Sequence, residues 1–235
     1  MARLDRSLIS GLPLFQGIAG SDLDFILQHA RSSRAAKDSV IFEQDEEAHF
    51  FYLLLDGHVR VVITAPAGQQ VIARYIGPGE IFGIAAALGR TAYPAMAVAA
   101  VDCVFLAWPN NQWKIFAERF PAFAANAYQT VGNRLQETQA RVVEMSTEQV
   151  EQRIARVLLK LANQTGRKTE GGILIDFPIS RQDIAEMTGT TLYTVSRILS
   201  GWESKGLVSS ERQKVTLTEP HKLFLLAEGQ EKRES

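Results

Sequence analysis

The stretch ISRQDIAEMTGTTLYTVSRILSGWESKGLV, residues 179–208, predicts two short helices joined at a glycine. Ser180 is followed three residues later by Asp183, a spacing typical of a capping box. In that arrangement a hydroxyl and a carboxylate bind the free backbone amides at the start of a helix. Gly189 can adopt the left-handed conformation that ends a helix without strain on a Cβ atom. We therefore expect a helix from Ser180 and a sharp turn at Gly189.

The second helix of this stretch, capped by Thr190 or Thr191, is expected to be amphipathic. Its apolar residues recur at intervals of three and four and should pack inward: Leu192, Val195, Ile198 and Leu199. The opposite side holds polar groups: Tyr193, Thr194, Ser196, Arg197 and Ser200. Such a face can bind phosphate oxygens and read base edges in the major groove of DNA. Any helical hairpin with a solvated outer face has the same periodicity, so the periodicity alone leaves both interpretations open.

The chain has 235 residues, enough for two domains and a long connecting element, and its composition is that of a soluble globular protein. The formal net charge is −1, which excludes a polycation bound to nucleic acid by charge alone. No apolar run reaches the roughly 18 to 20 residues that span a bilayer, and the N-terminus lacks a signal-peptide core. We expect a cytoplasmic protein without a membrane partner.

Cys103 is the only cysteine and lies in the apolar run VDCVFLAW. One thiol cannot form an internal disulfide or supply the four thiolates of an iron–sulfur cluster, so a small core residue is the expected role. The sequence contains no Walker loop, GxSxG, HExxH or paired cysteines. We therefore predict that the protein is not an enzyme and has no catalytic or metal-ligating residues.

The segment before residue 110 changes from a short helical entry to strands. The entry contains LPLF and SDLDFILQHA, with Ser21 as its expected N-cap. Residues 40–108 then form short β-rich runs separated by glycine, which predicts a compact antiparallel barrel or sandwich. Its hairpins are expected to reverse at three turns: Asp56-Gly57, Ala67-Gly68 and Gly77-Pro78-Gly79.

A long helical stretch follows, from about residue 111 to 145, interrupted near Pro121. Apolar positions alternate four and three apart along it, as in a heptad ridge: Ala124, Tyr128, Val131, Leu135, Thr138, Val142 and Met145. Such a ridge packs either against its own domain or against a second copy of the helix. After it we predict a helix over 148–162, a strand over 173–177, and a hairpin in LVSSERQKVTLTE.

The motif SRQDIAEMTGTTLYTVSRIL resembles the helix-turn-helix of the bacterial Crp/Fnr transcription regulators. The LPLF entry, the LLxGxVRV strand pair and the GPGEIFG turn are similar to the β-roll of cyclic-nucleotide-binding domains, which that family carries. The resemblance covers nearly the entire chain and implies an α+β fold. Its parts would be a β-roll sensor domain (1–110), a dimerisation helix (111–147) and a winged helix-turn-helix domain (148–235).

The resemblance also implies the residues that would touch DNA. Arg197 matches the arginine that binds guanine through O6 and N7, and Ser196 matches the serine of the Fnr type. The other matching positions are Ser180, Arg181, Gln182, Thr191, Leu192, Thr194 and, in the wing, Arg212, Gln213 and Lys214. Tyr193 stands where the family usually has a glutamate that accepts from a cytosine amine. We expect the base step read by that glutamate to be relaxed or changed.

For the sensor domain the resemblance implies an effector pocket at Gly83, Ile84, Tyr93, Pro94 and Thr138. Members that bind cyclic AMP have a glutamate and an arginine at the positions of Ile84 and Tyr93, so we do not expect cyclic-nucleotide binding. The nearest likeness is to the cluster-free, nitric-oxide-responsive branch (NnrR/Dnr-like), thought to use haem. His29, His49 or His58 could ligate haem iron, although none has a defining spacing.

The resemblance implies a homodimer that binds a palindromic site on double-stranded DNA, with RNA polymerase as a further partner if it activates. The dimerisation residues implied are Tyr128, Val131, Leu135, Thr138, Val142 and Met145. Two alternatives stay open. One is a regulator that needs no effector, and the other is a small-ligand receptor whose helical hairpin does not read DNA.

Overall fold

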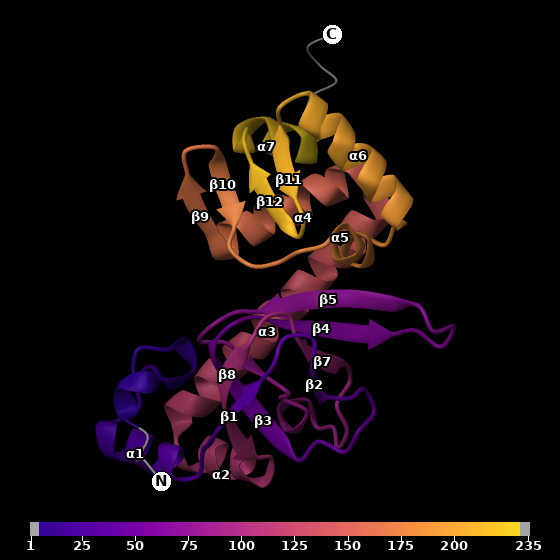
Figure 1. The fold of residues 1–235 in the computed structure, drawn as a ribbon. Helices are drawn as coiled ribbons and strands as arrows, with labels where there is room; N and C mark the ends of the chain where they lie inside the picture. Colours follow the sequence, from indigo (N-terminus) through magenta and orange to yellow (C-terminus); the bar gives the residue numbers. More distant parts are fainter. Residues whose placement is uncertain (1–4, 231–235) are drawn as a thin grey trace. The chain divides into compact units, whose positions relative to one another are not determined.

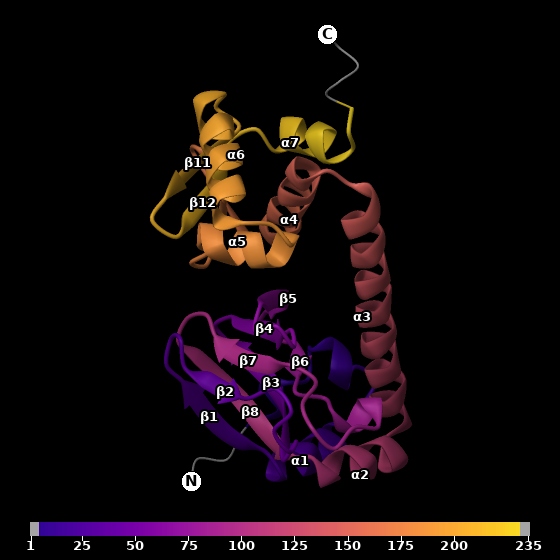
Figure 2. The ribbon, with the colours of Figure 1, turned by 90° about the vertical axis from the view of Figure 1, so that its right-hand side faces the viewer.

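The computed structural model describes residues 5–230 and contains two compact units. The first consists of residues up to Gly68 together with Ala73–Thr138. The second consists of Gln69–Ile72 and the chain from Gln139 onward. The boundary falls within one helix, α3 (Pro121–Thr147), which is drawn in both ribbon views (Figure 1, Figure 2). Each unit is described by itself below.

The first unit begins with short helices: η1 (Arg6–Leu8), η2 (Pro13–Phe15) and α1 (Gly20–Gln28). The expectation that Ser21 caps α1 is wrong. The N-cap is Ala19, whose carbonyl accepts from the amides of Asp22 and Leu23, and no side chain caps this end. Helical hydrogen bonding therefore starts two residues before Ser21, which lies inside the first turn.

Two four-stranded antiparallel sheets follow and form the predicted β-roll (Figure 1). Their strand orders are β1-β8-β3-β6 and β2-β7-β4-β5. The strands are β1 (Arg31–Ala35), β2 (Val40–Phe42), β3 (Phe50–Asp56), β4 (Val59–Thr64), β5 (Gln70–Ile76), β6 (Ile81–Phe82), β7 (Met96–Ala99) and β8 (Cys103–Pro109), with η3 (Ala86–Leu88) between β6 and β7. The β3–β4 turn requires glycine, because Gly57 has φ of 93° and an added Cβ would lie 2.5 Å from the Asp102 carbonyl oxygen.

The interior of the roll is filled with aromatic rings. Phe42 stacks on Tyr93 with ring centroids 3.8 Å apart, and Tyr52 stacks on Phe82 at 4.9 Å. The Tyr93 hydroxyl donates to the Phe50 carbonyl oxygen at 2.7 Å. Cys103 is buried in the same cluster, which confirms the small core residue expected from the sequence.

A second core lies on the other face of β3 and β8, beneath the helices. Trp108 is fully buried there and its indole nitrogen donates to the Ile26 carbonyl oxygen at 2.8 Å, which fixes α1 to the sheet. The helix α2 (Asn111–Arg119) ends at Phe120, and α3 starts afresh at Pro121. The interruption predicted near Pro121 is confirmed, because proline has no amide hydrogen to continue the first helix.

The second unit joins the end of α3 to the predicted winged helix-turn-helix (Figure 2). Its helices are α4 (Val150–Thr165), α5 (Arg181–Thr188), α6 (Leu192–Ser204) and α7 (Pro220–Ala227). Its sheet has the order β11-β12-β10-β9, from β9 (Gly166–Thr169), β10 (Gly172–Ile175), β11 (Val208–Glu211) and β12 (Lys214–Leu217). The sequence did not indicate β9 or α7. Among residues 5–230, no helix is long and apolar enough to cross a bilayer.

Candidate nucleic-acid interface and sensor site

The turn between α5 and α6 has the geometry predicted from its sequence. The Ser180 hydroxyl accepts from the Asp183 amide at 3.0 Å, and the Asp183 carboxylate accepts from the Ser180 amide at 2.7 Å. This capping box confirms the start of α5. Gly189 ends the helix with φ of 62° and ψ of 41°, in the left-handed region. The two helices are therefore separated by a turn of only three residues.

Thr191 is the residue that caps α6, and its hydroxyl accepts from the Thr194 amide at 3.1 Å. The helix buries the stripe Val195, Ile198, Leu199 and Trp202. Leu192, expected to pack inward with that stripe, is instead 47% exposed, so that expectation is wrong. It is the first residue of α6, one turn before the buried stripe begins at Val195.

The outer face of α6 has the polar groups expected there. Tyr193 is 77% exposed, Arg197 and Ser200 are also exposed, and Thr194 and Ser196 are half-buried. Within the described part of the chain, the Arg197 guanidinium forms no hydrogen bond or ion pair. A free guanidinium keeps all five of its donors available for an external acceptor such as a guanine edge or a phosphate.

Side-chain interactions near the C-terminal end of α6 bind it to neighbouring elements of the unit. The indole nitrogen of the buried Trp202 donates to the Glu151 carboxylate of α4 at 2.9 Å. Arg181 pairs with Glu203 at 3.3 Å and donates to the Ser210 hydroxyl at 3.2 Å. Arg181 is thus engaged inside the unit, between α5, α6 and β11.

The remaining predicted contact residues lie on two neighbouring segments. Gln182 is exposed on α5 and donates to Glu186 at 2.8 Å. The β11–β12 turn exposes Arg212, Gln213 and Lys214. The Ile179 amide donates to the Gln213 carbonyl oxygen at 3.0 Å, which places this turn beside the start of α5.

A surface hollow of about 340 Å³ lies between α6 and the start of α4. Arg197 and Thr194 line it, together with Lys205 and the first residues of α4. Sequence reasoning missed the start of α4, because its approach to α6 depends on packing between segments about fifty residues apart. It also missed Lys205, which directly follows α6 as its C-cap. The hollow adds one ammonium group and a helix N-terminus to the same surface.

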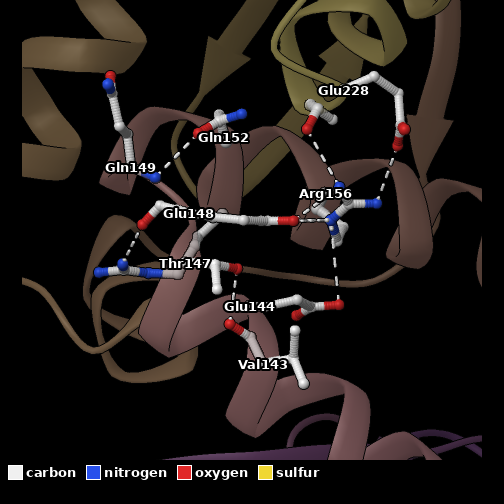
Figure 3. Close-up of polar contacts among 10 residues, drawn as sticks. Val143, Glu144, Thr147, Glu148, Gln149, Gln152, Arg156 and Glu228 are labelled. Atoms are coloured by element: carbon white, nitrogen blue, oxygen red, sulfur yellow. Dashed lines mark hydrogen bonds and ion pairs between the residues drawn. The ribbon is translucent and has the colours of Figure 1, made fainter.

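Arg156 connects three helices at the base of the second unit (Figure 3). Its guanidinium lies 2.7 Å from Glu148 and 3.2 Å from Glu228, and it donates to the Ala227 carbonyl oxygen at 3.0 Å. Glu144, near the end of α3, lies 3.9 Å away. The hydrogen bond to Glu148 raises the pKa of Arg156 above its ordinary value. The last turns of α3 are therefore bound to α4 and α7.

The residues expected to form an effector pocket lie in different surroundings. Ile84 and Tyr93 are buried in the two cores of the first unit, and Gly83 is packed against Tyr52 and Phe42. Pro94 is half-buried, and Thr138 is exposed on α3, where its hydroxyl donates to the Arg134 carbonyl oxygen at 2.9 Å. A cavity in this unit, beside Arg74 and Arg134, is lined by none of these five residues.

The three histidines considered for haem are dispersed. His29 ends α1, with its ring nitrogen 2.9 Å from the Phe25 carbonyl oxygen, while His49 precedes β3 and His58 lies in the β3–β4 turn. Among the described residues no three histidine, cysteine, aspartate or glutamate side chains converge as a metal site. None of the three histidines lines the cavity beside α3.

Two family models match this chain. Residues 33–120 match the cyclic nucleotide-binding domain, and residues 152–225 match the Crp-like helix-turn-helix domain. The cyclic AMP receptor protein of Thermus thermophilus is 31% identical over 200 residues, which are 85% of this chain and 89% of that protein.

Solved structures show the same architecture. A CRP-family transcriptional regulator from Thermus thermophilus superimposes with a TM-score of 0.71 at 28% identity, covering 83% of this chain and 96% of that one. FixK2 from Bradyrhizobium japonicum gives a TM-score of 0.75 at 24% identity, covering 84% and 96%. The fold and the α5–α6 surface therefore define a DNA-binding transcription regulator, not an enzyme.

The particular family follows from the coverage and identity of these matches. The chain belongs to the Crp/Fnr family of transcription regulators.

Proposed function

We propose that this regulator acts in the cytoplasm as a homodimer that inserts two copies of α6 into the major groove at a palindromic site. The observation that supports this most directly is the division of α6 into a buried stripe and a free outer face. Val195, Ile198 and Leu199 are buried, while Tyr193 and Arg197 are exposed. Half-sites about one helical turn apart, roughly 34–36 Å, suit such a pair of helices.

The contact residues in this proposal have different roles. Arg197 reads a guanine, with Ser196 beside it, while Ser180, Gln182, Thr191, Thr194 and the wing residues Arg212, Gln213 and Lys214 bind phosphates. Leu192 and Tyr193 face the groove at the start of α6. Arg181 contributes by holding α5 against Glu203. Phosphate contacts set the position on the duplex and base contacts set the sequence.

The dimer in this proposal forms along α3. Tyr128 is 74% exposed and Leu135 58% exposed, and Val142 and Met145 are exposed further along the same ridge. A ridge of large apolar side chains on one helix requires a covering surface, and a second copy of α3 supplies one with the same spacing. We propose domains at 1–110, 111–147 and 148–235, and RNA polymerase as a partner if the bound dimer activates.

We also propose that the effector is not a cyclic nucleotide. Ile84 and Tyr93 stand at the positions of the two polar anchors, and both are buried apolar or aromatic side chains. The nitric-oxide-responsive branch is supported by the likeness of the YTVSR segment. An absorption spectrum of protein supplied with haem tests that branch, because a haem-binding member would give a Soret band that shifts with nitric oxide.

Replacement of Arg197 by alanine tests the DNA-binding proposal. A bidentate contact to guanine contributes roughly 1–3 kcal/mol, so the ratio of specific to non-specific affinity should fall about 5- to 150-fold. The measurement is fluorescence anisotropy with a selected duplex and a scrambled one. The control is Arg90→Ala, an exposed arginine in the first unit. Unchanged preference in Arg197→Ala would favour a receptor that does not read DNA.

A further inference from the structure

Gly201 lies inside α6, on the side of the helix that lines the hollow between α6 and the start of α4. After proline, glycine is the least favourable residue in a helix interior, because it gains the most conformational freedom on unfolding. An added Cβ at Gly201 would meet no other atom within 4 Å, so packing inside the protein does not exclude a side chain there. What Gly201 provides is open space at the surface of α6.

Two cationic side chains flank Gly201, one helical turn away in each direction. Arg197 precedes it by four residues and Lys205 follows it by four, and all three line the hollow. Residues four apart lie on the same face of a helix, and eight residues span about 12 Å along its axis. Arg197 and Lys205 are exposed, and within the described residues neither forms a hydrogen bond or an ion pair. The space over Gly201 therefore has a free cation at each end.

The opposite wall of the hollow is the start of α4, which adds one negative charge. Glu151 lines the hollow, and its carboxylate accepts a hydrogen bond from the Trp202 indole nitrogen at 2.9 Å. The remaining polar residues of the lining, Gln149 and Thr194, are uncharged. Two free cations against one carboxylate give the hollow a net positive charge, which favours an anionic occupant.

The sugar-phosphate backbone of DNA is the anion that suits this position. A recognition helix enters the major groove with its N-terminal residues, so its later turns lie nearer the backbone that borders the groove. The major groove is about 12 Å wide, comparable to the distance along α6 from Arg197 to Lys205. One face of the helix can therefore place Arg197 at a base edge and Lys205 at a phosphate.

We infer that the Lys205 ammonium group binds a phosphate of the DNA backbone at the border of the groove, and that Gly201 leaves the room this strand needs to approach α6. The inference rests on the proposed function for the position of α6 in the groove. It adds to that function a contact in each protomer that is independent of sequence, since phosphate contacts position a protein on the duplex without reading bases. Neither Gly201 nor Lys205 belongs to the contact residues implied by the helix-turn-helix motif.

Fluorescence anisotropy of the full-length protein with a selected and a scrambled duplex, at several salt concentrations, tests the phosphate contact. Lys205→Gln should weaken binding to both duplexes by the same factor, at least about threefold at low salt. It should also reduce the slope of log K against log salt concentration by about 0.9 for each protomer. Lys205→Arg keeps the charge and should retain the slope. Lys222→Gln, which removes an exposed lysine of α7 that pairs with Glu219, is the matched control.

The salt dependence separates this contact from a structural role of Lys205. A cation at the C-terminal end of a helix also stabilises the helix through its dipole. If Lys205 did only that, Lys205→Gln would lower the urea midpoint and leave the salt slope for DNA binding unchanged. The slope is therefore the decisive measurement for this residue.

Gly201→Ala tests the open space, because its stability and its DNA affinity should change in opposite directions. Alanine favours the helix, so the urea midpoint should rise. Its methyl group projects into the hollow, so binding to both duplexes should weaken about twofold, and Gly201→Leu should weaken it about tenfold or more. Gly132→Ala is the matched control, at an exposed glycine inside α3 where an added Cβ also meets no atom within 4 Å. It should raise the midpoint and leave DNA binding unchanged, and sedimentation verifies the oligomeric state of each variant.

Equal losses on the two duplexes in Lys205→Gln and Gly201→Leu support the inference. It is overturned if Lys205→Gln keeps the affinity and salt slope of the wild type, or if its loss is confined to the selected duplex. It is also overturned if both Gly201 variants bind DNA as tightly as the wild type does. Failure of the proposed function would instead appear as unchanged preference in Arg197→Ala, whereas failure of this inference leaves the loss of preference in that variant intact.

Discussion

The indole nitrogen of Trp202 donates a 2.9 Å hydrogen bond to the carboxylate of Glu151. This bond crosses from α6 to α4 and joins the helix proposed to read DNA to the first helix of its unit. Trp202 is 1% exposed, whereas Glu151 is exposed and can regain water when its partner is removed. The two sides of the bond should therefore respond differently to mutation.

Trp202→Phe should destabilise the protein by about 1–3 kcal/mol, because it leaves a space in the core and removes a hydrogen bond to a charged group. Glu151→Gln keeps an acceptor and should cost about 0.5 kcal/mol or less. Urea denaturation followed by circular dichroism measures both. Equal losses for the two variants would contradict this account of the bond.

Removal of the Arg156 guanidinium should loosen the joint between α3 and α4. Arg156→Ala leaves Glu144, Glu148 and Glu228 near one another without a cation, and we expect a loss of about 1–2 kcal/mol. Arg156→Lys keeps the positive charge but not the planar set of N–H donors, so it should recover part of the lost stability. Hydrogen exchange of the 144–150 amides locates the effect. Lys114→Ala, which removes an exposed pair with Glu118, should change stability little.

Leu135→Glu should convert the proposed dimer to monomers. The substitution places a charge on the exposed ridge of α3, where a partner helix would bury it without a counter-ion. Sedimentation at micromolar concentration should show half the mass, and affinity for a two-half-site duplex should fall at least about tenfold. Gln136→Glu, which introduces the same charge at an exposed position of α3 outside the ridge, is the control. A dimer that persists in Leu135→Glu would place the subunit contact elsewhere.

Tyr193 should relax one step of the DNA half-site. A phenol cannot present a carboxylate acceptor to cytosine, so selection from random duplexes should return a fixed guanine opposite Arg197 and variation at the neighbouring step. Tyr193→Glu should restore a preference of about 1–3 kcal/mol there. Recovery of a strict family consensus by the unmodified protein would contradict the prediction.

Stability should decline at alkaline pH because of Cys103. Burial raises the pKa of its thiol, and Asp56 and Asp102 act in the same direction. The folded state keeps the proton while the unfolded chain loses it, so the contribution is complete below the unfolded pKa and is lost as pH rises toward the folded one. Between pH 7 and 9 the urea midpoint of the wild type should fall more steeply than that of Cys103→Ala. Parallel slopes would contradict this.

Local patterns in the sequence predicted the α5–α6 turn closely. Ser180 with Asp183 and the left-handed Gly189 fix their own geometry through bonds a few residues apart, so no distant contact decides them. The alternating strands of the roll were predicted for the same reason. Leu192 shows the limit of periodicity, since a residue on the apolar face is buried only where another element covers it.

Features that depend on segments far apart in the chain were not predicted. Arg74 and Arg134 are separated by sixty residues of strands and helices, and neither stands in a recognisable motif. The start of α4, from Gln149 to Glu151, lies beside Arg197 only through the packing of α4 on α6. The stacking of Phe42 on Tyr93 likewise depends on how distant segments of the roll pack together, and no local sequence pattern predicts it.

The stacked rings of Phe42 and Tyr93 limit how the ligand specificity of this roll could change. The Tyr93 ring stacks on Phe42 with centroids 3.8 Å apart, and its hydroxyl donates to the Phe50 carbonyl oxygen. Tyr93 therefore stabilises the packing inside the roll. Tyr93→Arg would remove that support before it could create an anchor for a nucleotide. Binding of a cyclic nucleotide would therefore require several coordinated replacements, so a single mutation could not change the ligand to which the roll responds.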